Sequence, residues 1–320
     1  MLTDIEETPS MKIRAIEKLR RDLPQEFLEA LNDPTTVEIM LNADGKLWQE
    51  RLGEKMRCIG KMSFSKAEAV IKTIAGYHGK EVTRFKPSLE GEFPLDGSRF
   101  AGQLPPIVVA PTFAIRKRAV AIFSLDQYVN SNIMTTHHFT ILKDAIANHR
   151  NILVIGGTGS GKTTLINAII HEIVEQNPNE RIFIIEDTGE IQCAAINRVQ
   201  YHTTIDVSMT MLLRTTLRMR PDRILVGEVR GPEALDLLMA WNTGHEGGSA
   251  TLHANNAIAG LTRLAMLISM HPDSPKPIEP LIAEAVHFLV HIARTQTGRC
   301  VQEVVEVKGY ENGRYIFNHL

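Results

Sequence analysis

A glycine-rich loop between an apolar run and an apolar periodic segment constrains this chain more than any other feature. Residues 151–155 read NILVI, residues 156–164 read GGTGSGKTT, and residues 165–170 read LINAII. This order is strand, loop and helix, and the loop fits the pattern GxxxxGK[ST]. Glycines let backbone N–H groups converge on a polyphosphate, and the following helix N-terminus favours its negative charge. The segment therefore predicts a site for ATP or GTP.

The individual residues of this loop have expected tasks. Lys162 should reach the β- and γ-phosphates, and the hydroxyl of Thr163 should ligate Mg²⁺. A flexible Gly/Ser loop is the alternative, and the flanking strand and helix argue against it. The expected phosphate-binding residues are Gly156, Gly157, Thr158, Gly159, Ser160, Gly161, Lys162, Thr163 and Thr164.

Length and composition are those of a soluble protein with about two domains. The chain has 320 residues, of which 43% are apolar and 22% charged. A net charge of −2 gives nucleic-acid binding no support, so no stable nucleic-acid binding is expected.

Three dispersed cysteines argue against a disulfide framework and fit a reducing cytoplasm. The acidic start MLTDIEETPS is no signal peptide, and no run approaches the ~18 apolar residues of a membrane span. Any membrane contact should be peripheral.

Residues 1–125 predict a small α+β domain. The pairs Asp44-Gly45 and Asp96-Gly97 mark tight turns between strand-like runs. Ser65 and Glu68 have the spacing of a capping box at the start of an amphipathic helix. Helices are expected over residues 11–31 and 65–77, and strands over residues 37–42, 46–50, 99–102 and 115–125.

Residues 126–136 are polar and predict a linker before an α/β domain over residues 137–320. In that domain helices alternate with short strands that are apolar on both faces, which is typical of a mostly parallel sheet covered by helices. The expected strands are residues 152–155, 182–185, 224–226 and 250–252, with a terminal hairpin over residues 301–307 and 314–317.

Two of these strands run into acidic residues. The first is followed by Glu186-Asp187, and the second by Gly227-Glu228. Hydrolysis at a P-loop needs a metal-binding carboxylate and a group that orients water, and both lie at the carboxyl ends of neighbouring strands. One acidic strand end is as often merely exposed, but two in one P-loop domain favour the functional interpretation.

Histidines and arginines provide further candidates. His253 follows a strand and should lie near a γ-phosphate, although a buried core histidine is the alternative. The spacing of His245 and His253 is not that of a metal site. P-loop oligomers can supply a cation to the γ-phosphate from another domain or subunit, while most arginines are simply solvated. The arginines considered are Arg99, Arg116, Arg118, Arg214, Arg218 and Arg220.

Four segments together resemble the type II/type IV secretion ATPases. They correspond to the Walker A motif, acidic box, Walker B motif and histidine box of that family, in that order. The segments are GGTGSGKTT at 156–164, IEDTGE at 185–190, RPDRILVGEVRG at 220–231 and TGHEGGSATLHAN at 243–255. The resemblance covers nearly all of residues 137–295. LDGSRFAGQLPP followed by FAIRKR also resembles the preceding domain of the conjugal-transfer branch.

The resemblance implies a RecA-like P-loop core that hydrolyses ATP with Mg²⁺. It implies that Thr163 and Glu186 hold the metal and that Glu228 orients or activates the attacking water. His253 would sense the γ-phosphate. Candidate arginines at the nucleotide are Arg99, Arg116 and Arg220.

The same resemblance implies a homo-hexamer in the cytoplasm, peripheral on the inner face of the inner membrane. Its partners would be inner-membrane secretion or conjugation proteins, and it would power pilus assembly and substrate transfer. Alternatives are a motor that extends or retracts a type IV pilus, a nucleotide-dependent docking switch without motor activity, and a nucleic-acid helicase or packaging motor.

Two departures from the family pattern limit this interpretation. The type II branch has a four-cysteine zinc module after the histidine box, whereas this chain has only Cys300 beyond position 200. Gly247-Gly248 stands where relatives commonly have one glycine, which leaves the position of His245 open.

Overall fold

The computed structural model describes residues 9–51, 54–117, 123–204, 206–296 and 298–320. The chain divides into two units, residues 1–120 and 121–320. Each unit has its own sheet and its own buried apolar core. Among the described residues, no helix combines the length and apolar character required to span a bilayer.

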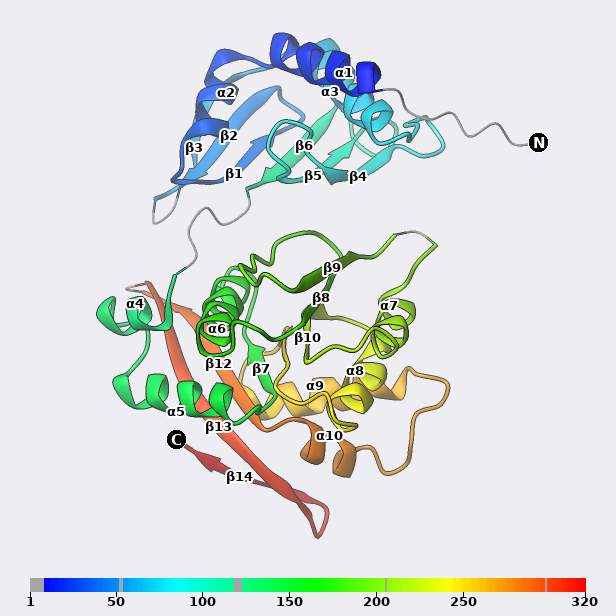
Figure 1. The fold of residues 1–320 in the computed structure, drawn as a ribbon. Helices are drawn as coiled ribbons and strands as arrows, with labels where there is room; N and C mark the ends of the chain where they lie inside the picture. Colours follow the sequence, from blue (N-terminus) through cyan, green and yellow to red (C-terminus); the bar gives the residue numbers. More distant parts are fainter. Residues whose placement is uncertain (1–8, 52–53, 118–122, 205, 297) are drawn as a thin grey trace, which may run out of the picture. The chain divides into compact units, whose positions relative to one another are not determined.

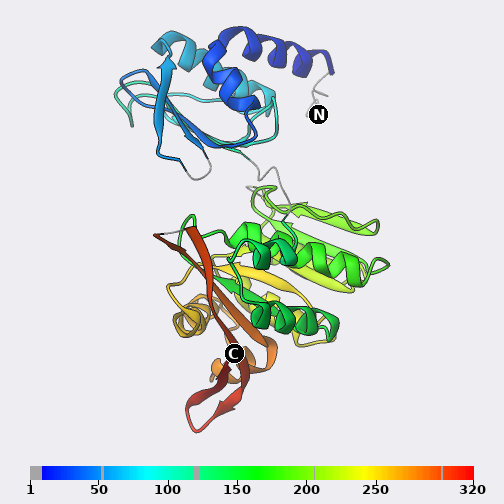
Figure 2. The same cartoon turned by 90° about the vertical axis from the view of Figure 1, so that its left-hand side faces the viewer.

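In the described part of the N-terminal unit, six strands form an antiparallel sheet in the order β3-β2-β1-β6-β5-β4. Helices α1, α2 and α3 lie on one face of this sheet (Figure 1 and Figure 2). The elements are α1 (Pro9–Asp22), α2 (Gln25–Asn32), β1 (Thr36–Leu41), β2 (Lys46–Arg51), β3 (Arg57–Lys61), α3 (Phe64–Tyr77), β4 (Ser88–Glu92), β5 (Arg99–Gln103) and β6 (Thr112–Arg116).

An aromatic cluster fills the space between this sheet and its helices. Phe27 of α2 packs edge-on against Phe93 and Phe113, and Phe100 packs against the same two rings, with centroids 5.9 to 6.2 Å apart. Alternation along β5 turns Phe100 to this core and leaves Arg99 on the opposite face.

Both Asp-Gly turns are confirmed, and two other local predictions are wrong. Gly45 and Gly97 have positive φ angles at the expected turns. Helix α3 is capped by Ser63, whose hydroxyl accepts from Lys66 N, so Ser65 is not the cap. The hydroxyl two residues earlier is the cap because the helix already begins at Phe64. Strand β6 ends at Arg116, and residues 118–122 of the expected longer strand lie outside the described residues.

The predicted linker contains a helix, α4 (Leu125–Asn130). Ser124 and Gln127 form a capping box at its start, and Leu125 and Tyr128 are buried. The polar residues that predicted a linker are therefore caps and exposed positions of a short helix. Helix α5 (Thr136–Ala147) begins at the last residue of the same segment, capped by Thr135.

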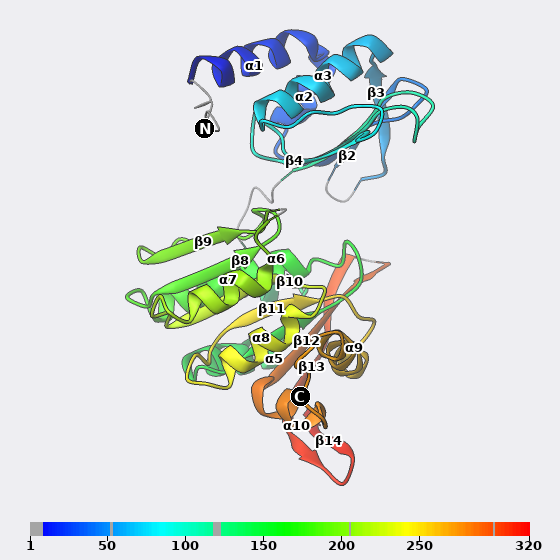
Figure 3. The ribbon, with the colours of Figure 1, turned by 90° about the vertical axis from the view of Figure 1, so that its right-hand side faces the viewer.

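The C-terminal unit is an α/β layer structure with an eight-stranded sheet in its described residues. The strand order is β14-β13-β12-β7-β11-β10-β8-β9, and β9 and β14 form the two edges (Figure 3). Neighbouring strands from β12 to β9 are parallel, whereas β13 and β14 are antiparallel. The strands are β7 (Ile152–Ile155), β8 (Ile182–Glu186), β9 (Arg198–His202), β10 (Arg223–Val229), β11 (Ser249–Leu252), β12 (Phe288–Thr295), β13 (Gly298–Glu311) and β14 (Arg314–His319).

Helices cover both faces of this sheet, so its central strands are apolar throughout. Along β7, Ile152 and Val154 pack in one core and Leu153 and Ile155 in the other, as period-two alternation requires. The helices are α6 (Lys162–Gln176), α7 (Met209–Thr216), α8 (Glu233–Trp241), α9 (Ala257–Ser269) and α10 (Glu279–Ala285), in addition to α4 and α5. The four expected strands and the terminal hairpin are confirmed, whereas β9 and β12 were not expected.

Candidate functional site

The glycine-rich loop connects β7 to α6. Gly161, the residue before α6, has φ +100°. This left-handed backbone conformation favours glycine, because side chains rarely adopt it. Ser160 N donates to Gly157 O at 3.3 Å and closes a turn within the loop. The structure thus has the strand, loop and helix that a phosphate cradle needs.

Lys162 lies across its own loop. Its Nζ atom donates to Gly156 O at 3.0 Å and to Gly157 O at 2.9 Å. Both acceptors are backbone carbonyls of the loop, which phosphate oxygens can replace because they bind the same ammonium group more strongly. The ammonium group is therefore already next to the loop that would hold the phosphates.

Thr163 contacts a carboxylate that the sequence analysis did not single out. Its Oγ1 atom donates to Glu190 Oε2 at 3.3 Å. Hydroxyl and carboxylate oxygens are the ligands that Mg²⁺ prefers, so this pair fits a nucleotide-bound Mg²⁺. The sequence feature that could have indicated Glu190 is its place at the end of the acidic box IEDTGE, four residues after Glu186.

Glu186 shapes the segment that carries Glu190. It is 2% exposed, and its Oε2 atom accepts from Glu190 N at 2.9 Å and from Ile191 N at 3.0 Å. His202 Nε2 lies 3.5 Å from the other carboxylate oxygen. The structure therefore places Glu190 at the Thr163 hydroxyl and Glu186 beneath it. Metal binding by Glu186 stays a prediction.

A register shift in β10 places Glu228 at the same edge of the sheet. Val226 pairs with Ala250 and Val229 with Leu252, so the two strands have unequal numbers of residues between these pairs. Such bulges redirect side chains and are frequent beside active sites. Gly227 makes this possible, since a Cβ there would lie 2.9 Å from Cβ of Glu186 on the neighbouring strand.

Arg230 connects the two acidic strand ends. Its Nη2 atom donates to Glu228 Oε2 at 2.5 Å, and its Nη1 atom lies 3.5 Å from Asp187 Oδ2. The guanidinium group thus balances two carboxylates beside the loop. Sequence reasoning missed Arg230 because nothing in its local pattern distinguishes it from a solvated arginine.

His253 is exposed and follows the last residue of β11. Leu252 pairs with Ile155, and Gly156 N donates to Leu252 O at 3.4 Å, so His253 begins at the strand edge where the loop begins. His245 lies before β11, at the opposite edge. Of the two histidines, only His253 is beside the loop.

The predicted arginines belong to other elements than the loop and the acidic strand ends. Arg99 and Arg116 are cross-strand partners on β5 and β6 of the N-terminal unit, flanked by Glu92 on β4 and Glu38 on β1. Arg220 precedes β10, at the amino ends of the parallel strands, whereas the loop follows the carboxyl end of β7. Within one chain, Arg220 is thus at the wrong edge for the phosphates.

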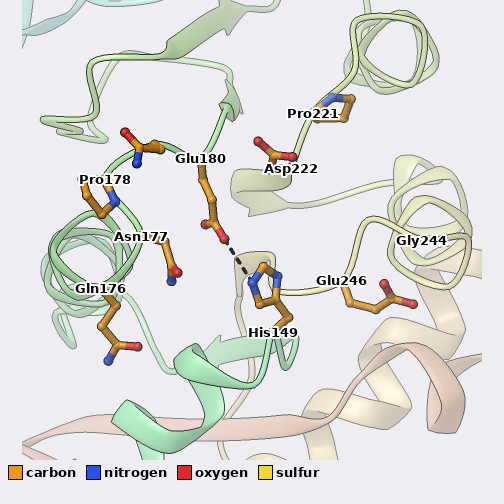
Figure 4. A pocket seen from close by; sticks show the side chains of 10 residues that line it. His149, Gln176, Asn177, Pro178, Glu180, Pro221, Asp222, Gly244 and Glu246 are labelled. Atoms are coloured by element: carbon orange, nitrogen blue, oxygen red, sulfur yellow. Dashed lines mark ion pairs between the residues drawn. The ribbon is translucent and has the colours of Figure 1, made fainter.

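A cavity of about 510 Å³ opens at that opposite edge. Figure 4 shows His149 and Glu180 pointing toward one another across it, with Nε2 3.0 Å from Oε1. Behind Glu180, the fully buried Arg223 donates to Glu180 Oε2 at 2.5 Å and to Gly247 O at 3.0 Å. The cavity is thus distant from the glycine-rich loop. Glu180, which lines it, forms an ion pair with the buried guanidinium group of Arg223.

Comparison with known proteins identifies the family. The protein-family model described as "Type II/IV secretion system protein" matches residues 99–317 of this chain. The chain belongs to this family. The resemblance in the four sequence boxes is therefore confirmed.

Two similar proteins align with almost the whole length of this chain. The probable conjugal transfer protein TrbB of Sinorhizobium fredii is 48% identical over 302 residues, covering 94% of this chain and 92% of the relative. The crystal structure of the VirB11 ATPase from the Brucella suis type IV secretion system, in complex with sulphate, is 25% identical, with a TM-score of 0.50, covering 92% of this chain and 96% of that one. These similarities support an ATPase of the conjugal-transfer and type IV secretion group.

A third similarity concerns the fold alone. The pilus retraction motor PilT with bound ADP has a TM-score of 0.61 at 18% identity, covering 93% of this chain and 83% of that one. The fold of this chain is therefore similar to that of this pilus retraction motor.

Proposed function

We propose that this chain is an ATP-hydrolysing motor of a type IV secretion or conjugal-transfer system. The main support is a group of four residues at the carboxyl ends of the parallel strands, namely Lys162, Thr163, Glu190 and Glu228. The order β12-β7-β11-β10-β8 is the basis for a RecA-like core. A homo-hexamer that contacts inner-membrane secretion proteins at the cytoplasmic face is part of the proposal, supported by family membership.

In this proposal the loop binds ATP through its backbone N–H groups, and Lys162 exchanges two carbonyl acceptors for phosphate oxygens. The Thr163 hydroxyl and the Glu190 carboxylate would hold Mg²⁺, which when bound neutralises charge developing on the phosphates. Glu186 maintains the backbone that positions Glu190.

The chemical step needs a base for water. Glu228 would accept a proton from water while the water oxygen attacks the γ-phosphorus and the bond to the ADP oxygen breaks. Arg230 holds one oxygen of the Glu228 carboxylate and leaves the other to accept the proton. Arg99 and Arg116 remain proposed phosphate-contacting residues.

His253→Ala should lower kcat for ATP about 10-fold and leave KM nearly unchanged, because loss of a γ-phosphate contact affects turnover more than ground-state binding. Steady-state ATPase rates on purified protein measure both constants. His245→Ala is the matched control, since His245 lies before the amino end of β11, at the opposite edge of the sheet, and this variant should turn over at the wild-type rate. Equal rates for the two variants would return His253 to a structural role.

Two other functions have specific tests. A nucleotide-dependent docking switch would bind ATP without sustained turnover, so a wild-type rate at background level would favour it. A type IV pilus motor has the same boxes, and the PilT fold is similar. A Lys162→Ala allele in the native host separates the two motors, since loss of plasmid transfer with normal twitching motility supports the conjugal system.

A further inference from the structure

Glu303 on β13 contacts the start of helix α9. Its Oε1 atom accepts a hydrogen bond from Ala257 N at 2.7 Å. Ala257 is the first residue of α9, and the first N–H groups of a helix have no acceptor within the helix. Asn256 supplies one local acceptor, to Ala259 N at 2.8 Å. Glu303 supplies another from 46 residues away, and its negative charge suits a helix N-terminus.

The segment between β11 and this contact is short and carries His253. Residues 254–256 alone separate His253 from Ala257. The preceding end is held by β11, whose Leu252 O accepts from Gly156 N. The following end is held by α9, which packs beside β12 and β13 (Figure 3) and approaches β7 so closely that a Cβ at Gly260 would lie 2.3 Å from Cδ1 of Ile155.

Two histidines lie near the Glu303 carboxylate. It lies opposite His291 of β12, whose Nδ1 is 3.7 Å from Glu303 Oε1, and His319 Nδ1 is 3.9 Å from Oε2. The His291 side chain is 8% exposed, and burial lowers its pKa while Glu303 opposes that shift. His291 and His319 therefore lie beside the Glu303 carboxylate, on the strands that flank β13.

We propose that Glu303 is a positioning residue for His253, acting through the N-terminus of α9. This inference rests on the proposed role of His253 at the γ-phosphate. Glu303 fixes the first turn of α9 through Ala257 N and so limits where residues 253–256 can lie. Misplacing a contact by about 1 Å can cost up to about 10²-fold in rate, so even a small shift should be measurable.

The test is a double-mutant cycle on ATP turnover with Glu303→Ala, His253→Ala and the double variant. Glu303→Ala should lower kcat about 5- to 10-fold with KM within about 2-fold. The double variant should be no slower than His253→Ala within about 2-fold, because a positioning residue has no effect once the positioned group is absent. Glu306→Ala is the matched control on the same strand, since Glu306 pairs with Lys308 and should turn over normally.

Two conservative variants separate the contact from the charge. Glu303→Gln keeps an oxygen that can accept from Ala257 N and should retain nearly the wild-type rate. Glu303→Asp keeps the charge but is one methylene shorter, so it should be as slow as Glu303→Ala. The rates of these two variants still test the inference if Glu303→Ala does not fold.

The outcomes are distinct. If Glu303→Ala slows turnover by the same factor with and without His253, Glu303 acts independently of His253 and the inference is wrong. A wild-type rate in Glu303→Asp, or an Ala-like rate in Glu303→Gln, contradicts it equally. If His253→Ala alone has the wild-type rate, the proposed role of His253 fails first, and the inference fails with it.

Discussion

Lys162→Ala should abolish measurable ATP turnover, a loss of about 10³-fold or more, and leave the chain folded. A cation that clamps a transferring phosphoryl group acts on charge that develops in the transition state, where such contacts are worth most. In the structure the Lys162 ammonium donates to Gly156 O and Gly157 O. These are carbonyls of the loop itself, so the side chain adds little to the core.

ATPase assays, thermal melting and binding of a fluorescent ATP analogue measure this prediction together. Lys308→Ala is the matched control, because it removes an exposed lysine of the same unit whose partner is Glu306. It should match the wild type in all three measurements. Near-normal turnover in Lys162→Ala would contradict the nucleotide site itself, whereas loss of the melting transition would mean that the lysine has a structural role.

Features set by local sequence could be predicted from the sequence. The loop at 156–164, the apolar strands around it and the Asp-Gly turns each depend on residues next to one another. Helix α4 was missed for a local reason too: Ser124 and Gln127 resemble loop residues until their reciprocal hydrogen bonds show them to be a capping box.

Features set by contacts across the fold could not be predicted. Glu190 reaches Thr163 because the buried Glu186 carboxylate accepts from the backbone N–H groups of Glu190 and Ile191. Arg230 gains its place from a bulge in β10, and Glu303 from the packing of α9 beside β13. The acidic ends of β8 and β10 lie at the same edge of the sheet as the loop, as the sequence predicted, whereas the contacts of each acid depend on tertiary packing.

Glu228→Gln should bind ATP with nearly wild-type affinity and hydrolyse it about 10²- to 10⁴-fold more slowly, the usual cost of losing a general base. The amide keeps the shape of the side chain and an oxygen for Arg230 Nη2, but it cannot take a proton from water. Single-turnover assays and analogue binding separate chemistry from affinity.

Two neighbouring acids make this prediction specific. Glu233→Gln is the matched control, because the Glu233 carboxylate accepts from Arg230 N and Gly231 N, both at 2.8 Å, and an amide oxygen can still accept. It should hydrolyse ATP at the wild-type rate. Glu190→Gln is the competing test, since Glu190 is the carboxylate in contact with Thr163. Turnover that survives in Glu228→Gln and is lost in Glu190→Gln would assign the base to Glu190, and Glu228 would then be a partner of Arg230 alone.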